Sequence, residues 1–191
     1  MKLYSHAAIT AVLSAAVLVA TPNVLQAQEQ HADDHQAMHD AKLPKHAVAV
    51  LASTSDSDVK GVLMLDQMEG FVRVHGKVIG LTPGEHGFHI HEFGDLTKAD
   101  GTSAGGHYAP AGHDHGAPGK QSHAGDLGNI TANDDGVATV DIKAEDLKLH
   151  LVLGRSIVVH GGKDDLKSQP SGAAGPRVGV GVIGVANTEA K

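Results

Sequence analysis

The fold class is decided by Leu81-Thr82-Pro83-Gly84-Glu85-His86-Gly87-Phe88-His89-Ile90-His91, a stretch that passes from turn to strand within a few residues. Thr82-Pro83-Gly84 has the residues of a tight turn, and the part at 87–91 has the pattern of a short β-strand. Residues two apart on a strand point to the same face, so His89 and His91 project together. The stretch therefore predicts a strand that presents two imidazoles on one side.

Seven further runs of β-branched and aliphatic residues predict strands, at 48–51, 59–65, 71–79, 137–142, 147–153, 156–160 and 178–185. In 147–153 the leucines recur with period two, which predicts one leucine face. Helical periodicity is scarce, and only a single helical turn is expected, at 163–168. Short strands joined by Gly-rich turns predict one all-β domain, an antiparallel Greek-key β-sandwich or barrel.

Two long segments interrupt this pattern of strands, at 92–128 and 161–177. Long loops without regular structure are uncommon in a compact domain unless they carry function. The first loop follows directly on His91 and holds four histidines, and the second follows directly on His160. The first loop contains the candidate ligands His107, His113, His115, His123 and Asp126. We therefore expect a site that is built on strand ends and closed by two functional loops.

The composition indicates what chemistry such a site supports. The chain has 191 residues, of which 15 are histidine, and it has no cysteine and no tryptophan. Its formal net charge is −7, with only three Phe and two Tyr, so it lacks the basic surface and the stacking groups that nucleic-acid binding requires. Histidine is the commonest protein ligand of copper and zinc. The composition therefore favours a metal site and argues against nucleic-acid binding.

The first 27 residues have the layout of a cleaved export signal. Lys2 is their only charged residue, an apolar run covers 7–20, and Leu25-Gln26-Ala27 fits a small-residue cleavage site. The alternative is a membrane anchor, but the apolar run is shorter than the ~20 residues that span a bilayer. We therefore expect an exported protein, periplasmic or secreted, without stable membrane insertion.

Residues 28–46 form a polar, histidine-rich segment, and the folded domain is expected at 47–191. His31, His35 and His39 are four residues apart, so they would share one face if the segment became helical. One interpretation is an auxiliary arm that collects metal. The other is a flexible tail whose histidines are incidental, since composition alone is weak evidence.

The opening stretch, extended to Asp95, resembles the signature of the copper/zinc superoxide dismutases. The resemblance continues through the segments 101–108, 115–118, 123–129, 154–160 and 175–184. These segments span nearly all of 47–186 in the order of the family, which is more specific than any single motif. The chain is similar to an exported, bacterial-type variant of this family that has no cysteine.

The resemblance implies one copper and one zinc per chain. The implied copper ligands are His89, His91, His107 and His160. The implied zinc ligands are His107, His115, His123 and Asp126. His107 belongs to both sets because an imidazolate binds one metal through each nitrogen. His113 remains the alternative to His115, and Asp164 is implied as the carboxylate that ties a copper histidine to a zinc histidine.

The activity implied by the resemblance is dismutation of superoxide to dioxygen and hydrogen peroxide. His107 would supply a proton, and Arg177 would bind and orient the anion. Two alternatives stay open on the same fold: a non-catalytic, exported copper/zinc-binding or copper-delivery protein, and a relic that binds zinc without redox-active copper. The complete copper set and Arg177 favour the enzyme, and the family habit implies a homodimer.

The chain also departs from the family pattern. Members normally have a disulfide that pins the first long loop to the barrel, and Gly101 and Val180 stand at the corresponding positions. The second loop is short. We therefore expect the loops to depend more on zinc for their order. Among the other histidines, His86 is expected to be structural, and His75 and His150 are expected at the surface or rim.

Overall fold

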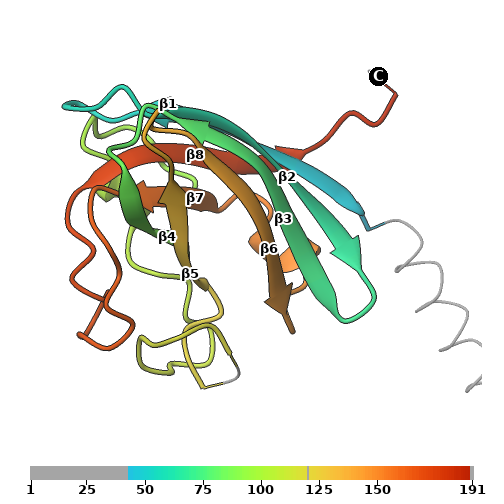
Figure 1. Ribbon diagram of the computed structural model, residues 1–191. Helices are drawn as coiled ribbons and strands as arrows, with labels where there is room; N and C mark the ends of the chain where they lie inside the picture. Colours follow the sequence, from blue (N-terminus) through green and yellow to red (C-terminus); the bar gives the residue numbers. More distant parts are fainter. Residues whose placement is uncertain (1–42, 120, 190–191) are drawn as a thin grey trace, which may run out of the picture. The chain divides into compact units, whose positions relative to one another are not determined.

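The computed structural model describes residues 43–119 and 121–189, which fold into a closed antiparallel β-barrel (Figure 1). The strands follow one another around the barrel in the order β1-β2-β3-β6-β5-β4-β7-β8. Their bounds are β1 His46–Ser53, β2 Lys60–Met68, β3 Phe71–Ile79, β4 Gly84–His91, β5 Asp126–Ala132, β6 Ala138–Glu145, β7 Ser156–His160 and β8 Arg177–Val185. β3 lies beside β6, and β4 lies beside β7, which is Greek-key connectivity. The predicted all-β antiparallel barrel is confirmed.

Alternating burial explains why these segments form strands. In β3, Val72 and Val74 are buried in the barrel core, whereas Arg73 between them is exposed. Such alternation lets one face of each strand pack inward while the other meets solvent.

Strands β4 and β7 depart from this alternation, since nearly all of β4 and all of β7 are buried. Phe88 and Ile90 point into the core of the barrel. His89 and His91 alternate with them and therefore point to the outer face, where they are also buried. The long connections cover this part of the barrel wall, and the histidines lie between the wall and the connections.

The prediction of a strand at 147–153 is wrong. The segment contains the short helix α2, Leu149–Val152, in which Leu149 is fully buried and Leu151 is 48% exposed. The side-chain oxygen of Gln67 accepts a hydrogen bond from the Leu149 backbone N–H at the helix start, with an N···O distance of 2.7 Å. Because the pairing of β1 with β8 already closes the strand order, the sheet has no free terminal strand beside which a ninth strand could be added.

Two other expectations about elements also fail. The first long loop was expected to reach residue 128, but β5 begins at Asp126 and pairs with β4. The second is the helical turn at 163–168, where the structure has no helix. There the Asp165 carboxylate accepts hydrogen bonds from the backbone N–H groups of Lys167 and Ser168, which makes a local turn instead.

Side chains and backbone groups fasten the two long connections to the barrel. The first connection, 92–125, contains the short 3₁₀ helix η1, Thr102–Ala104, and the second covers 161–176. Gly101 lies against Val180: a Cβ atom added at Gly101 would be 2.9 Å from Val180 Cγ2. Arg177 donates hydrogen bonds to the carbonyl oxygens of Gly101 and Gly105. Packing and hydrogen bonds therefore hold the first connection at the positions where the resemblance implies a disulfide.

No helix within residues 43–119 and 121–189 has the length and apolar character needed to cross a membrane.

Candidate metal centre

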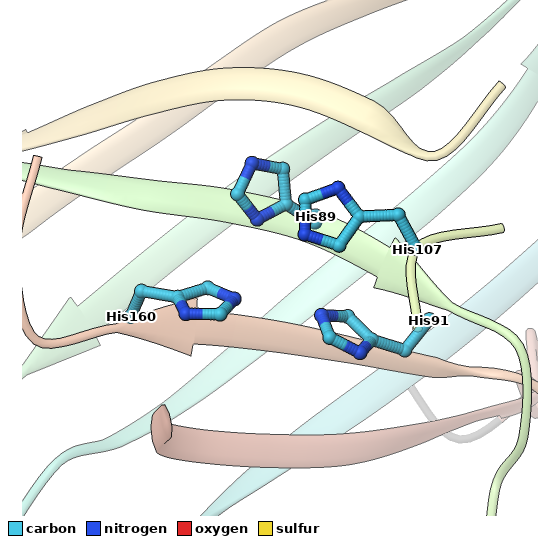
Figure 2. A group of neighbouring side chains, drawn as sticks. All are labelled: His89, His91, His107 and His160. Atoms are coloured by element: carbon cyan, nitrogen blue, oxygen red, sulfur yellow. The ribbon is translucent and has the colours of Figure 1, made fainter. Parts of the chain in front are cut away.

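Four histidines gather on the outer wall of the barrel (Figure 2). His89 and His91 come from β4, His160 ends β7, and His107 comes from the first connection, where it forms an isolated bridge with His91. One nitrogen of each ring lies within 4.8 Å of one nitrogen of every other ring, and all four residues are buried. We refer to these residues as the four-histidine group.

The chemistry of this group is indicated by its unpaired atoms. His89 Nδ1, His91 Nε2, His107 Nε2 and His160 Nε2 are buried and have no hydrogen-bond partner. A buried polar atom without a partner costs about 1–3 kcal/mol, so such atoms are rare unless a ligand uses them. Four imidazole nitrogens around one space are a donor set that suits copper.

The other ring nitrogens of the group are each held by a hydrogen bond. His91 Nδ1 donates to the Gly105 carbonyl at 2.9 Å, and His160 Nδ1 donates to the Gly175 carbonyl at 3.0 Å. Because a carbonyl oxygen only accepts, the proton of each ring is at Nδ1 and the lone pair is at Nε2. The backbone thus sets the tautomer that a metal requires.

A second group, His107, His115, His123 and Asp126, lies beside the first. Asp126 Oδ1 is 2.8 Å from His107 Nδ1, 3.1 Å from His115 Nδ1 and 3.3 Å from His123 Nδ1. Three imidazoles around one carboxylate oxygen provide the ligand types of a closed tetrahedral zinc site. We refer to these residues as the three-histidine-aspartate group.

His107 joins the two groups. Its Nδ1 contacts Asp126 of the three-histidine-aspartate group, while its unpaired Nε2 belongs to the four-histidine group. A single imidazole can therefore face both metals, one through each nitrogen.

Asp164 makes a second link between the groups. Its carboxylate accepts a hydrogen bond from His89 Nε2 at 2.8 Å and another from His115 Nε2 at 2.9 Å. Asp164 is fully buried, and Asn129 contacts both its backbone N–H and its carbonyl. The sequence analysis gave Asp164 the role of tying a copper histidine to a zinc histidine, and in the structure its carboxylate contacts one ring of each group.

Burial keeps three histidines of the four-histidine group, His89, His91 and His160, neutral. Burial lowers the pKa of His89 and of His91 to about 2, and that of His160 to about 4. For Asp126, burial alone would raise the carboxyl pKa, but hydrogen bonds from His107 and from the Gly116 backbone outweigh it and hold the pKa at about 2. Neutral imidazoles and an ionised carboxylate are the forms that bind metals.

An open cavity of about 420 Å³ leads to the four-histidine group. His91, His107 and His160 line it together with Arg177 and Ser171. Burial lowers the pKa of the Arg177 guanidinium, but an arginine side chain stays charged in proteins. Its two hydrogen bonds to backbone carbonyls hold this positive charge at the cavity wall.

The remaining candidate residues lie outside the two groups. His113 Nδ1 contacts the Ser122 carbonyl at 3.2 Å, and it is His115 that lies in the three-histidine-aspartate group. His86 is buried between the Thr82 and His160 carbonyls, His75 contacts Asp66, and His150 is exposed. The histidines of the arm, His31, His35 and His39, are not among the described residues.

The sequence analysis missed the groups that hold the ligands in place. These are the carbonyls of Gly105 and Gly175 and the side chain of Gln169, which contacts the backbone of His115. No sequence signal identifies the carbonyls, because every residue has one.

Comparison with known proteins agrees with the geometry. The family model described as copper/zinc superoxide dismutase (SODC) matches residues 59–183. The chain is 45% identical to the extracellular superoxide dismutase [Cu-Zn] of Onchocerca volvulus, an alignment that covers 74% of this chain and 77% of the relative. It is also 45% identical to superoxide dismutase [Cu-Zn] 2 of Mesembryanthemum crystallinum, over 73% of this chain and 94% of that protein. Superoxide dismutase [Cu-Zn] 3 of Arabidopsis thaliana is 45% identical over 73% of this chain and 90% of its own length.

The barrel, the two metal-ligand groups and these matches agree on one assignment. The chain belongs to the copper/zinc superoxide dismutase family, and its reaction is the dismutation of superoxide.

Proposed function

We propose that each chain holds one copper in the four-histidine group and one zinc in the three-histidine-aspartate group. The observation that carries this proposal is the set of four buried, unpaired imidazole nitrogens around one space. A four-nitrogen site suits a redox-active copper, whereas three histidines and one carboxylate suit a structural zinc.

When bound, copper supplies a one-electron cycle in which one superoxide is oxidised to dioxygen and a second, with two protons, is reduced to hydrogen peroxide. The protein supplies the proton and the orientation of the anion. His107 presents Nε2 to the cavity while its Nδ1 is held beside Asp126, so Nε2 would be the atom that takes up a proton from solvent and passes it to the reduced product. A proton donor must first lie within hydrogen-bond reach of the atom that it protonates, and its pKa then determines how readily it gives the proton.

Arg177 binds and orients the substrate. The chain has a formal net charge of −7, which repels an anion, so attraction must arise locally. The fixed guanidinium on the cavity wall provides that positive field next to His91 and His160. We expect Arg177→Ala to lower the rate of superoxide decay about tenfold or more at unchanged copper content. The rate for Arg177→Lys should lie between those of the wild type and Arg177→Ala.

The primary test is the decay rate of superoxide with the purified protein loaded with one copper and one zinc per chain. We expect fast decay that is lost in His91→Ala and retained in His150→Ala, which alters an exposed histidine outside both groups. Full copper occupancy without faster decay would contradict the proposed sites.

We further propose that residues 1–27 are a cleaved export signal and that the protein acts in the periplasm or outside the cell. Residues 1–42, which contain the signal and most of the arm, lie outside the described residues, and the support for both comes from their composition. The relative from Onchocerca volvulus is named as extracellular, which agrees with export. N-terminal sequencing of the mature protein is the test, with Gln28 as the expected first residue.

The arm at 28–46 is proposed to collect metal through His31, His35 and His39. Deletion of residues 28–45 is then expected to lower copper occupancy when copper is limiting and to leave it unchanged when copper is in excess. Equal occupancy under limiting copper would show that the histidines of the arm are incidental.

A homodimer is proposed through the outer face of β1, β2 and β8. Val50 and Val62 lie opposite each other on β1 and β2 and are 64% and 53% exposed, and Val182 on β8 is also exposed. Exposed apolar clusters of this kind mark contact sites. In sedimentation equilibrium we expect Val50→Glu to shift the protein towards monomer. Met68→Glu, which changes an exposed apolar residue at the far end of β2, is the control.

A further inference from the structure

The segment that carries His115 has little backbone support. Within the described part of the chain, no backbone–backbone hydrogen bond involves residues 113–118. The Gly116 N–H is instead bound by the Asp126 carboxylate at 3.1 Å. A ligand on such a segment needs another restraint, because loops without ladder hydrogen bonds are the least stable parts of a fold.

Gln169, in the second connection, provides that restraint. Its side-chain oxygen accepts a hydrogen bond from the His115 backbone N–H at 2.9 Å, and its side-chain nitrogen donates one to the His115 carbonyl at 2.8 Å. The amide of one side chain thus pairs with both polar groups of a single residue, as a neighbouring strand would. Two bonds at one residue fix its orientation as well as its position.

The same connection also holds the ring of His115. Asp164 Oδ1 accepts from His115 Nε2 at 2.9 Å, while His115 Nδ1 lies 3.1 Å from Asp126. Gly172 packs against this contact in the left-handed conformation, at φ +68°, and a Cβ atom there would collide with Asp164. The second connection therefore restrains His115 at the backbone through Gln169 and at the ring through Asp164.

We propose that Gln169 is a positioning residue for zinc: its two-point contact with the His115 backbone holds this ligand in the geometry that zinc requires. The proposal rests on the proposed zinc ligand set and adds to it a residue that touches neither metal. Because the chain has no cysteine, this non-covalent contact is one of the ties between the two connections. Its loss is expected to affect zinc and to spare copper, since His89, His91 and His160 do not contact Gln169.

The test replaces Gln169 in the full-length protein by methionine, which keeps the length of the side chain and removes both hydrogen bonds. The matched control is Ser168→Ala, which removes a hydrogen bond to Asp165 inside the same connection and leaves the contacts of His115 intact. Each protein receives one equivalent of reduced copper, which has no d–d bands, and then Co²⁺ as a spectroscopic probe of the zinc site. The release of zinc from separately prepared copper/zinc protein to a chelator is measured in parallel.

We expect the wild type and Ser168→Ala to share a tetrahedral Co²⁺ spectrum and one zinc release rate. Gln169→Met should show a weaker or shifted Co²⁺ spectrum and zinc release that is about tenfold faster, as expected for two lost hydrogen bonds. The electron paramagnetic resonance spectrum of oxidised copper should be the same in all three proteins.

Two results would overturn the positioning role. One is a Gln169→Met protein that matches the wild type in Co²⁺ spectrum and zinc release, and the other is a Ser168→Ala protein that changes as much as Gln169→Met. A wild-type protein without a tetrahedral Co²⁺ spectrum would instead contradict the zinc ligand set itself, so the two failures are distinguishable.

Discussion

Burial and hydrogen bonds together set the charge of each ionisable residue in this protein, and the buried histidines show the effect of burial most clearly. In the folded chain burial lowers the pKa of His89 and His91 to about 2 and of His160 to about 4, whereas an unfolded chain has histidine pKa values of about 6.5. Below about pH 6.5 these histidines bind protons in the unfolded chain, whereas in the folded chain they stay neutral. Acid therefore favours unfolding of the metal-free protein.

The resulting prediction concerns the melting temperature. We expect the metal-free protein to melt at a clearly lower temperature at pH 5 than at pH 7, with a much smaller change for the metal-loaded protein, whose ligand nitrogens are occupied. Calorimetric scans at both pH values measure this. An identical melting temperature of the metal-free protein at pH 5 and pH 7 would contradict the burial argument.

Which of His113 and His115 binds zinc also depends on the contacts of a single residue. The ring of His115 contacts Asp126 and Asp164, whereas the ring of His113 contacts the Ser122 carbonyl. We expect His115→Ala to lose zinc and His113→Ala to keep one zinc per chain, as measured by metal analysis after dialysis. Zinc loss in the His113 variant alone would reverse the assignment.

Much of the candidate site could be predicted from the sequence because strand alternation is a strict rule. His89 and His91 had to share a face, and the order of the motifs placed His107, His160 and the zinc ligands around them. The spacing could not separate His113 from His115, since both lie in an irregular segment without periodicity. Only the three-dimensional path of that segment shows which ring faces Asp126.

At the level of elements, runs with clear alternation were predictable and runs that depend on tertiary pairing were not. The leucines at 147–153 have a strand pattern, yet the strand order is already closed by the pairing of β1 with β8, and the segment contains the helix α2 instead. Asp126 and Gly128 are among the first three residues of β5, and aspartate and glycine are more typical of loops than of strands. Pairing with β4 overrides that local preference.

The contact between the first connection and β8 leads to a prediction at this scale. A Cβ atom at Gly101 would lie 2.9 Å from Val180 Cγ2, which is bonded to Val180 Cβ, so two cysteines there would have Cβ atoms less than about 4.5 Å apart, within reach of a disulfide. We expect Gly101→Cys with Val180→Cys to form this bond on oxidation and to raise the temperature of unfolding. The gain is reduced because Gly101 has φ 73°, a conformation that costs a non-glycine residue about 1–2 kcal/mol.

Mass spectrometry with and without alkylation measures bond formation in this double variant. The single variant Gly101→Cys is the control for the cost of the left-handed backbone. A double variant that stays fully reduced in air would show that the two backbones do not approach as described.

At the level of the whole molecule, the metals and the barrel contribute to stability in different places. The barrel closes through backbone pairing, whereas the residues of the three-histidine-aspartate group lie in the first connection and at the start of β5. We expect limited proteolysis to cut the metal-free protein within 108–125 and to leave the zinc-loaded protein intact there. Identical cleavage of the two forms would contradict a role of zinc in ordering the connection.

The closure of the barrel has a consequence for the time between synthesis and metal loading. β1 pairs with β2 on one side and with β8 on the other, so the first and last strands of the described barrel are not free edges, and only β5 and β6 are joined by a single residue pair, Ala132↔Ala138. Free sheet edges are templates on which other chains add strands and start aggregates. Loss of both metals would loosen the connections without opening such an edge. The pairing of β1 with β8 therefore favours a metal-free chain that stays in solution until copper binds and does not start aggregates.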